Sequence, residues 1–234
     1  MVNAQSIRYV NKVDDSGWVT VQPKGTTSIA DRLALCKYTK ILLTENKDRR
    51  TYFKVLDGTH SGKIASMSEQ NATLFFGTQA PTSSPLNLTI TYGKYVEGWE
   101  SKARRNQKIN QQFATLTTQG LSITVTMNSV WGLSFTPLRP GHYAVLAPDV
   151  PHKGNMTTYY RTVAPTLIHD QVWFPIKYEN NSRYIHVGNV SEGCATVVDL
   201  EKWVLLCEAL VSHRSVDGKT VGQLVVTGVP ERKI

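Results

Sequence analysis

Short β-like apolar runs recur along most of the chain, and at 88–92 and 121–127 apolar and polar residues alternate with a period of two; this pattern predicts a mainly β protein with few helices. In the first 77 residues, short runs of this kind end at glycine-containing turns. The strands predicted there are 7–10, 18–21, 52–56, 63–67 and 73–76. One helix is predicted between them, because Ile29, Leu33 and Cys36 follow Ser28 at helical spacing.

The second half has similar β-like runs and one helix late in the chain, before a last strand. A stretch rich in proline, serine and threonine, 78–86, indicates a linker. Beyond it, strands are predicted at 88–92, 121–127, 143–146, 172–176, 183–187 and 223–227. A broad apolar stripe predicts a helix from Asp199, its expected N-cap, to about His213. We therefore expect a small β-rich module (1–77), the linker (78–86) and a mostly β domain (87–234).

Composition and charge limit the classes of partner. Hydrophobic residues make up 41% of the chain, which suffices for a core, and without a run of ~18 apolar residues no membrane insertion is expected. The net charge of +8 favours anionic partners such as nucleic acid, wall polymers or a membrane surface. A nucleic-acid partner is not expected, because no binding motif accompanies the basic cluster at 102–108, which indicates a solvated helix face or loop.

Three cysteines supply one candidate for chemistry. Their odd number and the absence of a Cys-x-x-Cys pair exclude a disulfide framework and a structural zinc site, so no metal or other cofactor is expected. Cys36 and Cys207 fall in apolar helical patterns, where a cysteine is a small buried residue. Cys194 instead follows a short segment of small, turn-forming residues.

The segment from His186 to Cys194 has the parts of a nucleophilic site. His186 ends a strand-like run, and the segment after it is long enough to bring the imidazole and the thiol together. A reactive thiol needs exposure, a nearby base and backbone N–H donors. Gly193 also lets a substrate carbonyl approach the backbone closely. These residues predict Cys194 as the nucleophile and His186 as its base.

This arrangement resembles the L,D-transpeptidase (YkuD-like) family, of which the chain looks like a divergent member. The resemblance runs through His186, Ser191, Gly193 and Cys194, then the helix and the last strand, and covers roughly 121–228. Upstream, 136–143 looks like a stretched form of the family's Thr-Pro-x-Gly segment. Glu192 stands where the family often has histidine, and the connector between histidine and cysteine is short, as in phage-borne and secreted-effector branches.

The resemblance implies a β-rich catalytic domain that acts on peptidoglycan stem peptides through a thioester on Cys194. His186 would take the thiol proton, and an ion pair would keep the thiolate near neutral pH. The Ser191 carbonyl would orient the imidazole, and the backbone N–H groups of Gly193 and Cys194 would stabilise the oxyanion. An amine acceptor would give cross-linking or D-amino-acid exchange, and water would give carboxypeptidase trimming.

Several aromatic and polar residues are expected to surround His186 and Cys194. Residues expected to line the substrate pocket are Trp173, His152, Tyr184, Asn189 and Glu192, although core packing also explains the aromatic ones. His152 and His169 are loop-like and fit either a cleft or a solvated loop, whereas His60 and His213 are expected at the surface.

The sequence also bears on where the protein acts and on which other functions stay open. The first residues lack a secretory signal, so delivery from the cytoplasm to the cell envelope without one is expected, with a secretion or immunity protein as a further partner. The small module weakly resembles Src-homology-3-like wall-binding modules around 52–64. Two alternatives stay open: a non-catalytic wall-binding or interaction protein, and an NlpC-type peptidase, which places cysteine before histidine and here has only His213 suitably downstream.

Overall fold

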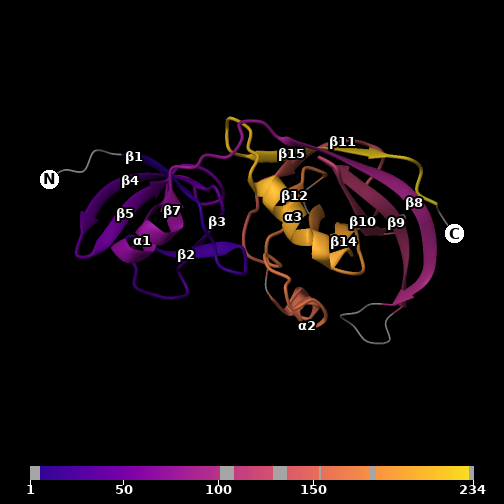
Figure 1. Ribbon diagram of the computed structural model, residues 1–234, viewed down its shortest axis with the longest axis horizontal. Coiled ribbons are helices and arrows are strands. Elements are labelled where there is room, and N and C mark those ends of the chain that lie inside the picture. Colours follow the sequence, from indigo (N-terminus) through magenta and orange to yellow (C-terminus); the bar gives the residue numbers. More distant parts are fainter. Residues whose placement is uncertain (1–5, 101–107, 129–135, 153, 180–182, 232–234) are drawn as a thin grey trace.

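The computed structural model describes residues 6–100, 108–128, 136–152, 154–179 and 183–231. It is mainly β, as predicted, and its strands form two sheets, which lie side by side in Figure 1. The basic cluster predicted as a solvated helix face or loop lies almost entirely outside the described residues. None of the helices in the described part is long and apolar enough to cross a membrane.

The first sheet has seven strands in the order β3-β2-β6-β5-β4-β1-β7. Its elements are β1 (Ser6–Val10), β2 (Trp18–Pro23), β3 (Leu33–Cys36), β4 (Lys40–Lys47), β5 (Arg50–Val55), β6 (Ile64–Ser68), α1 (Glu69–Phe75) and β7 (Phe76–Gly77). Four of the strands predicted here, those that became β1, β2, β5 and β6, are confirmed.

Two predictions in this sheet are wrong. Residues 33–36 form β3 rather than a helix, because they pair antiparallel with β2 from Trp18 to Val21. Residues 73–75 belong to helix α1 rather than a strand, because the hydroxyl of Ser68 caps the helix by accepting from the Asn71 backbone N–H at 3.2 Å. Strand β4, which pairs with β1 and β5, was not predicted.

The second sheet closes into a barrel of eight strands in the order β10-β14-β13-β12-β11-β15-β8-β9. Its strands are β8 (Leu86–Glu100), β9 (Lys108–Thr118), β10 (Leu121–Asn128), β11 (Gly141–Leu146), β12 (Phe174–Ile176), β13 (Arg183–Val187), β14 (Ala195–Val197) and β15 (Thr220–Thr227). The helices here are η1 (Gly154–Met156), α2 (Tyr160–Val163) and α3 (Leu200–Val211). All six predicted strands of this half are confirmed, whereas β9 and β14 were not predicted.

Helix α3 confirms the predicted late helix and fills the core. Its buried residues recur at helical spacing, with Trp203 fully buried against Phe174. Asp199 is the N-cap residue of α3, as predicted, but its carboxylate makes no cap hydrogen bond and accepts instead from the Thr124 backbone N–H at 2.9 Å. It thereby ties the start of the helix to strand β10.

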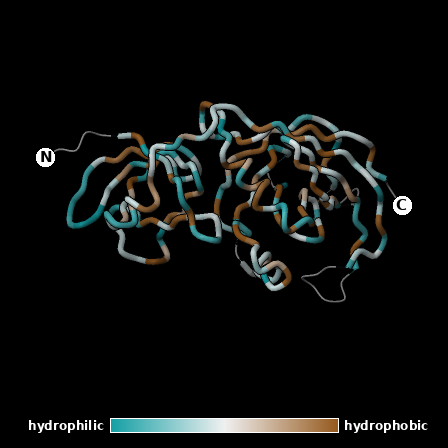
Figure 2. Tube along the Cα trace, in the orientation of Figure 1, coloured by the Kyte–Doolittle hydropathy of each residue, from teal (hydrophilic) through white to brown (hydrophobic). Residues whose placement is uncertain are grey.

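The two sheets share part of one core. The larger apolar cluster of the barrel also contains three residues from the first part of the chain, Trp18, Cys36 and Tyr38. The Trp18 indole donates to the Gln171 carbonyl at 3.2 Å, which adds a polar contact to this interface. Figure 2 shows apolar residues inside both bodies. The boundary between the two domains stays a prediction. The first sheet is held against the barrel by these contacts and not only by the connecting segment.

Candidate active site

Strands β13 and β14 run parallel and place the predicted catalytic residues on one face. His186 pairs with Thr196 in the register, and Cys194 immediately precedes β14, which puts it beside Tyr184. Because side chains alternate along a strand, all four residues share a face. Diagonal neighbours of this kind have Cα atoms roughly 7–8 Å apart, within reach of long side chains. The fold therefore brings the histidine and the cysteine into the same neighbourhood.

The His186 imidazole is buried and both ring nitrogens have partners. Nδ1 lies 2.8 Å from the Val187 carbonyl oxygen and Nε2 lies 3.2 Å from the Thr196 hydroxyl. Because a carbonyl only accepts, Nδ1 carries the proton and Nε2 accepts from Thr196. Burial lowers the pKa of His186 to about 4, against the opposing effect of the Val187 carbonyl. The imidazole is therefore neutral near pH 7, with its lone pair on Nε2.

Cys194 is half-buried as a whole residue, whereas Cys36 and Cys207 are buried as predicted. Burial of the sulfur raises the pKa of Cys194 to about 11, although the Tyr184 backbone N–H and the charge of Arg183 act to lower it. No hydrogen bond joins the thiol to the imidazole among the described residues. The expected thiolate–imidazolium ion pair is therefore wrong for the resting protein, in which both groups are neutral.

Ser191 holds the backbone around Cys194 rather than the imidazole. The Ser191 carbonyl was predicted to orient the His186 imidazole, but it accepts from Gln111 Nε2 at 2.9 Å. The Val187 carbonyl orients the imidazole instead. The Ser191 hydroxyl donates to the Cys194 carbonyl at 2.6 Å and accepts from the Gly193 N–H at 3.0 Å. The Gly193 N–H is thus occupied and cannot serve as the predicted oxyanion donor in this conformation.

Gly193 is nevertheless required by the local backbone. Its φ of +137° lies in the region that favours glycine over residues with a side chain. This conformation turns the chain from Ser191 into strand β14, and it sets the Cys194 side chain at the start of that strand.

An aromatic stack covers the imidazole. The Trp173 ring lies between His186, at 3.9 Å between centroids, and His152, at 4.1 Å, and both pairs are nearly parallel. Tyr184 contacts the edges of Trp173 and His152, and its hydroxyl donates to Asp149 at 3.3 Å. His152 lies 3.3 Å from the same carboxylate. Three of the predicted pocket residues are therefore assembled beside His186.

The other predicted pocket residues flank the site differently. Asn189 is buried, and its carbonyl accepts from the Trp99 indole at 3.0 Å, so it fixes the loop after β13. Glu192 is exposed, and its charge contributes to raising the pKa of Cys194. His169 is buried, with its Nδ1 3.5 Å from the Glu208 carboxylate, so it does not lie in a solvated loop.

Three residues of the site were not predicted. Thr196 lies two positions after Cys194, so strand alternation could have identified it once β14 was recognised. Gln111 comes from β9, and Asp149 comes from the loop after β11. Neither belongs to the local motif around His186: the barrel brings Gln111 to Ser191, and Asp149 to Tyr184 and His152.

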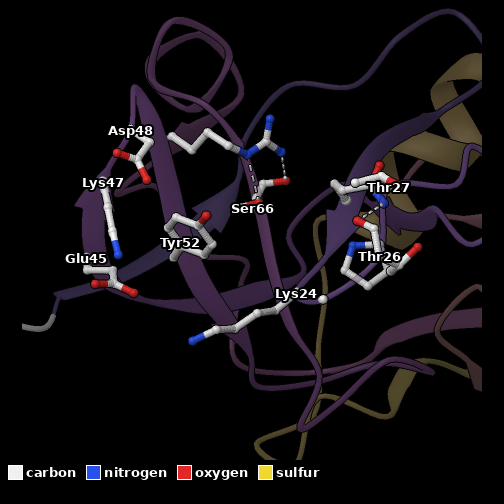
Figure 3. A pocket seen from close by; sticks show the side chains of 12 residues that line it. Lys24, Thr26, Thr27, Glu45, Lys47, Asp48, Tyr52 and Ser66 are labelled. Carbon is white, nitrogen blue, oxygen red and sulfur yellow. Dashed lines mark hydrogen bonds between the residues drawn. The ribbon is translucent and has the colours of Figure 1, made fainter.

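A separate polar hollow of about 460 Å³ lies on the first sheet and contains none of the predicted site residues. Figure 3 shows Glu45, Lys47 and Asp48 on one side of it and Lys24 and Thr26 on the other. The dashed lines at Ser66 mark two hydrogen bonds that the Arg50 guanidinium donates to this residue, at 3.0 and 3.1 Å. Charges of both signs line this open hollow.

Comparison with known proteins gives no match to a family model, to a curated protein or to a solved structure.

Proposed function

We propose that the protein is a cysteine acyltransferase that acts on peptidoglycan stem peptides, with Cys194 as nucleophile and His186 as base. The observation that carries this proposal is the placement of a neutral imidazole and the one half-buried cysteine on the same face of adjacent parallel strands. The choice of stem peptides rests on the sequence resemblance. The peptidoglycan partner and delivery to the cell envelope belong to the same proposal.

The reaction follows from these groups. As the Cys194 sulfur attacks the carbonyl before a terminal D-residue, its proton passes to His186 Nε2. The Cys194 backbone N–H is the proposed oxyanion donor. The imidazolium then gives the proton to the leaving amine of the D-residue, and a thioester remains on Cys194. An amine acceptor or water cleaves the thioester and restores the thiol.

The resting geometry favours general-base catalysis by His186 rather than a preformed thiolate–imidazolium pair between Cys194 and His186. With the pKa of His186 near 4 and that of Cys194 near 11, proton transfer must accompany attack. The thiol must leave the Tyr184 backbone N–H, and the Thr196 hydroxyl must release Nε2 or pass a proton to it. Catalytic hydrogen bonds commonly tighten only when substrate is bound. The stack on Trp173 keeps the imidazole in place meanwhile.

Incubation with purified tetrapeptide muropeptides, read by mass spectrometry, tests the proposal. Wild type is expected to remove or exchange the terminal D-alanine, and Cys194→Ala is expected to leave the muropeptides unchanged. Cys207→Ala is the matched control, because it removes a buried thiol and keeps the one at 194. Identical product profiles for wild type and Cys194→Ala would exclude the enzyme.

A non-catalytic wall-binding or interaction protein is the second candidate. The observation that favours it is the occupation of both imidazole nitrogens together with a protonated thiol. The same experiment separates the two, because a binding protein leaves every muropeptide mass unchanged.

A further inference from the structure

Strand β9 carries two adjacent glutamines, Gln111 and Gln112, whose side chains are both fully buried. A buried amide is costly unless its donor and acceptor groups find partners. Because side chains alternate along a strand, the two amides point to opposite faces of β9. The Gln112 amide stays within its own hairpin, since Nε2 donates to the carbonyls of Gly93 and Phe113 at 2.7 and 3.2 Å. Gln111 instead reaches the segment that carries Cys194.

The Gln111 amide bonds to both backbone polar groups of Ser191. Its Oε1 accepts from the Ser191 N–H at 2.5 Å, and its Nε2 donates to the Ser191 carbonyl at 2.9 Å. The orientation of the amide is fixed, because an N–H can only donate and a carbonyl can only accept. Ser191 lies in the connection between β13 and β14, and two neighbouring residues of an antiparallel pair exchange bonds in the same way. The side chain therefore takes the place of a neighbouring strand at Ser191.

Ser191 passes this constraint on to Cys194. The Ser191 hydroxyl donates to the Cys194 carbonyl at 2.6 Å and accepts from the Gly193 N–H at 3.0 Å. The backbone of Ser191 is thus bound to β9, while its side chain is bound to the turn before β14. Because this turn sets where the Cys194 side chain begins, a displacement of Ser191 would also displace the sulfur.

The same hairpin holds the segment at a second point. The Trp99 indole of β8 donates to the Asn189 carbonyl at 3.0 Å. Gln111 differs from Trp99 in two respects: it bonds to both polar groups of its partner, and that partner is the residue that bonds to Cys194. Gln111 is therefore the residue of the hairpin that bears most directly on the nucleophile.

We propose that Gln111 is a positioning residue for the nucleophile: by holding Ser191, it sets where the Cys194 sulfur lies. The effect of this role on turnover rests on the proposed acyl transfer. His186 is fixed by its own hydrogen bonds and by its stack on an indole, so a displaced sulfur loses its reach to Nε2. A misplacement of ~1 Å costs on the order of 10²-fold in rate. Gln111 is fully buried and cannot contact a substrate, so its loss should lower kcat and leave KM unchanged.

The kinetics of Gln111→Leu beside those of Gln112→Leu test this role. Both variants replace a buried amide of β9 by an apolar side chain of similar size, so both should lower the thermal stability. Only Gln111→Leu is expected to lower kcat for the muropeptide, by about 10–10²-fold with KM within about twofold, at a temperature at which both variants are folded. An equal loss of kcat in the two variants, or no loss in Gln111→Leu, would overturn the role.

Gln111→Glu supplies a rescue that depends on pH. A protonated carboxyl group can accept from the Ser191 N–H and donate to the Ser191 carbonyl, as the amide does, whereas a carboxylate cannot donate. Burial favours the protonated form. The rate relative to wild type at the same pH should therefore be highest at low pH and fall as the carboxyl group ionises. A ratio that stays constant between about pH 5 and pH 8 would contradict the role, and this variant decides if Gln111→Leu does not fold.

Alkylation of Cys194 by iodoacetamide measures its positioning without any turnover. Mass spectrometry of the Cys194 peptide gives the rate constant, with the buried Cys207 as the internal reference. The sulfur is buried in the wild type, so release of Ser191 should raise the alkylation rate of Gln111→Leu by about threefold or more. Gln112→Leu should react as wild type does. If the wild type turns over no muropeptide, the proposed function fails and this rate alone decides the role of Gln111. An unchanged alkylation rate in Gln111→Leu would overturn that role.

Discussion

His186→Gln is expected to lower the rate of muropeptide processing by about 10²–10⁴-fold, the usual contribution of a general base. Glutamine is close in size and can still bond to the Val187 carbonyl and the Thr196 hydroxyl, but it cannot take the thiol proton. The fold should therefore remain while the chemistry is lost. The measurement is the initial rate of D-alanine release at pH 7, at matched protein concentration.

The pH dependence of the wild-type rate adds a second check on His186. Burial lowers the pKa of this imidazole to about 4, so the base is neutral at higher pH and becomes protonated as the pH falls through that value. The acid limb of the rate should therefore lie near pH 4 rather than near the usual histidine value.

His142→Gln, the same substitution at an exposed histidine, should keep the wild-type rate. An unchanged rate in His186→Gln would remove His186 from the mechanism.

Trp203→Ala is expected to lower the free energy of unfolding by about 3–5 kcal/mol. Trp203 is fully buried among the core residues of the barrel, and its indole donates to the His169 carbonyl at 3.0 Å. The substitution leaves a cavity and an unpaired carbonyl in the same place. Because native domains are stable by only about 5–15 kcal/mol, this loss is large.

Urea unfolding followed by circular dichroism measures this effect. Leu205→Ala is the matched control, because Leu205 lies on the same helix with its side chain 55% exposed. That control should change the free energy of unfolding by less than about 0.5 kcal/mol. A loss under about 1 kcal/mol in Trp203→Ala, or an equal loss in both variants, would mean that α3 does not anchor the core.

The sequence predicted those elements of the fold whose own residues carry a clear period. Strand β10 alternates over its full length, β13 is a short apolar run, and α3 has a broad apolar stripe, so each was identified. Residues 33–36 form a strand only because β2 lies beside them, and their helical spacing with Ile29 gave no sign of this. Strand β14 has three residues, too few for a period, and its parallel partner determines it.

The sequence predicted the two central residues of the candidate site but not their pKa values. His186 and Cys194 were identified from a local motif, and the parallel pairing of their strands gives them a common face. The burial that lowers the pKa of His186 and raises that of Cys194 comes from distant segments, such as the one that carries Trp173. The role of Ser191 also depends on Gln111 of strand β9, which no local motif connects to it.

The most direct test of acyl transfer is to find the thioester itself. Wild-type protein is mixed with a tetrapeptide muropeptide, quenched in acid and digested, and the cysteine peptides are weighed by mass spectrometry. We expect an adduct on the Cys194 peptide equal to the substrate less its terminal D-alanine, with none on the peptides of Cys36 or Cys207. Turnover without this adduct, an adduct on another cysteine, or neither turnover nor adduct would contradict it.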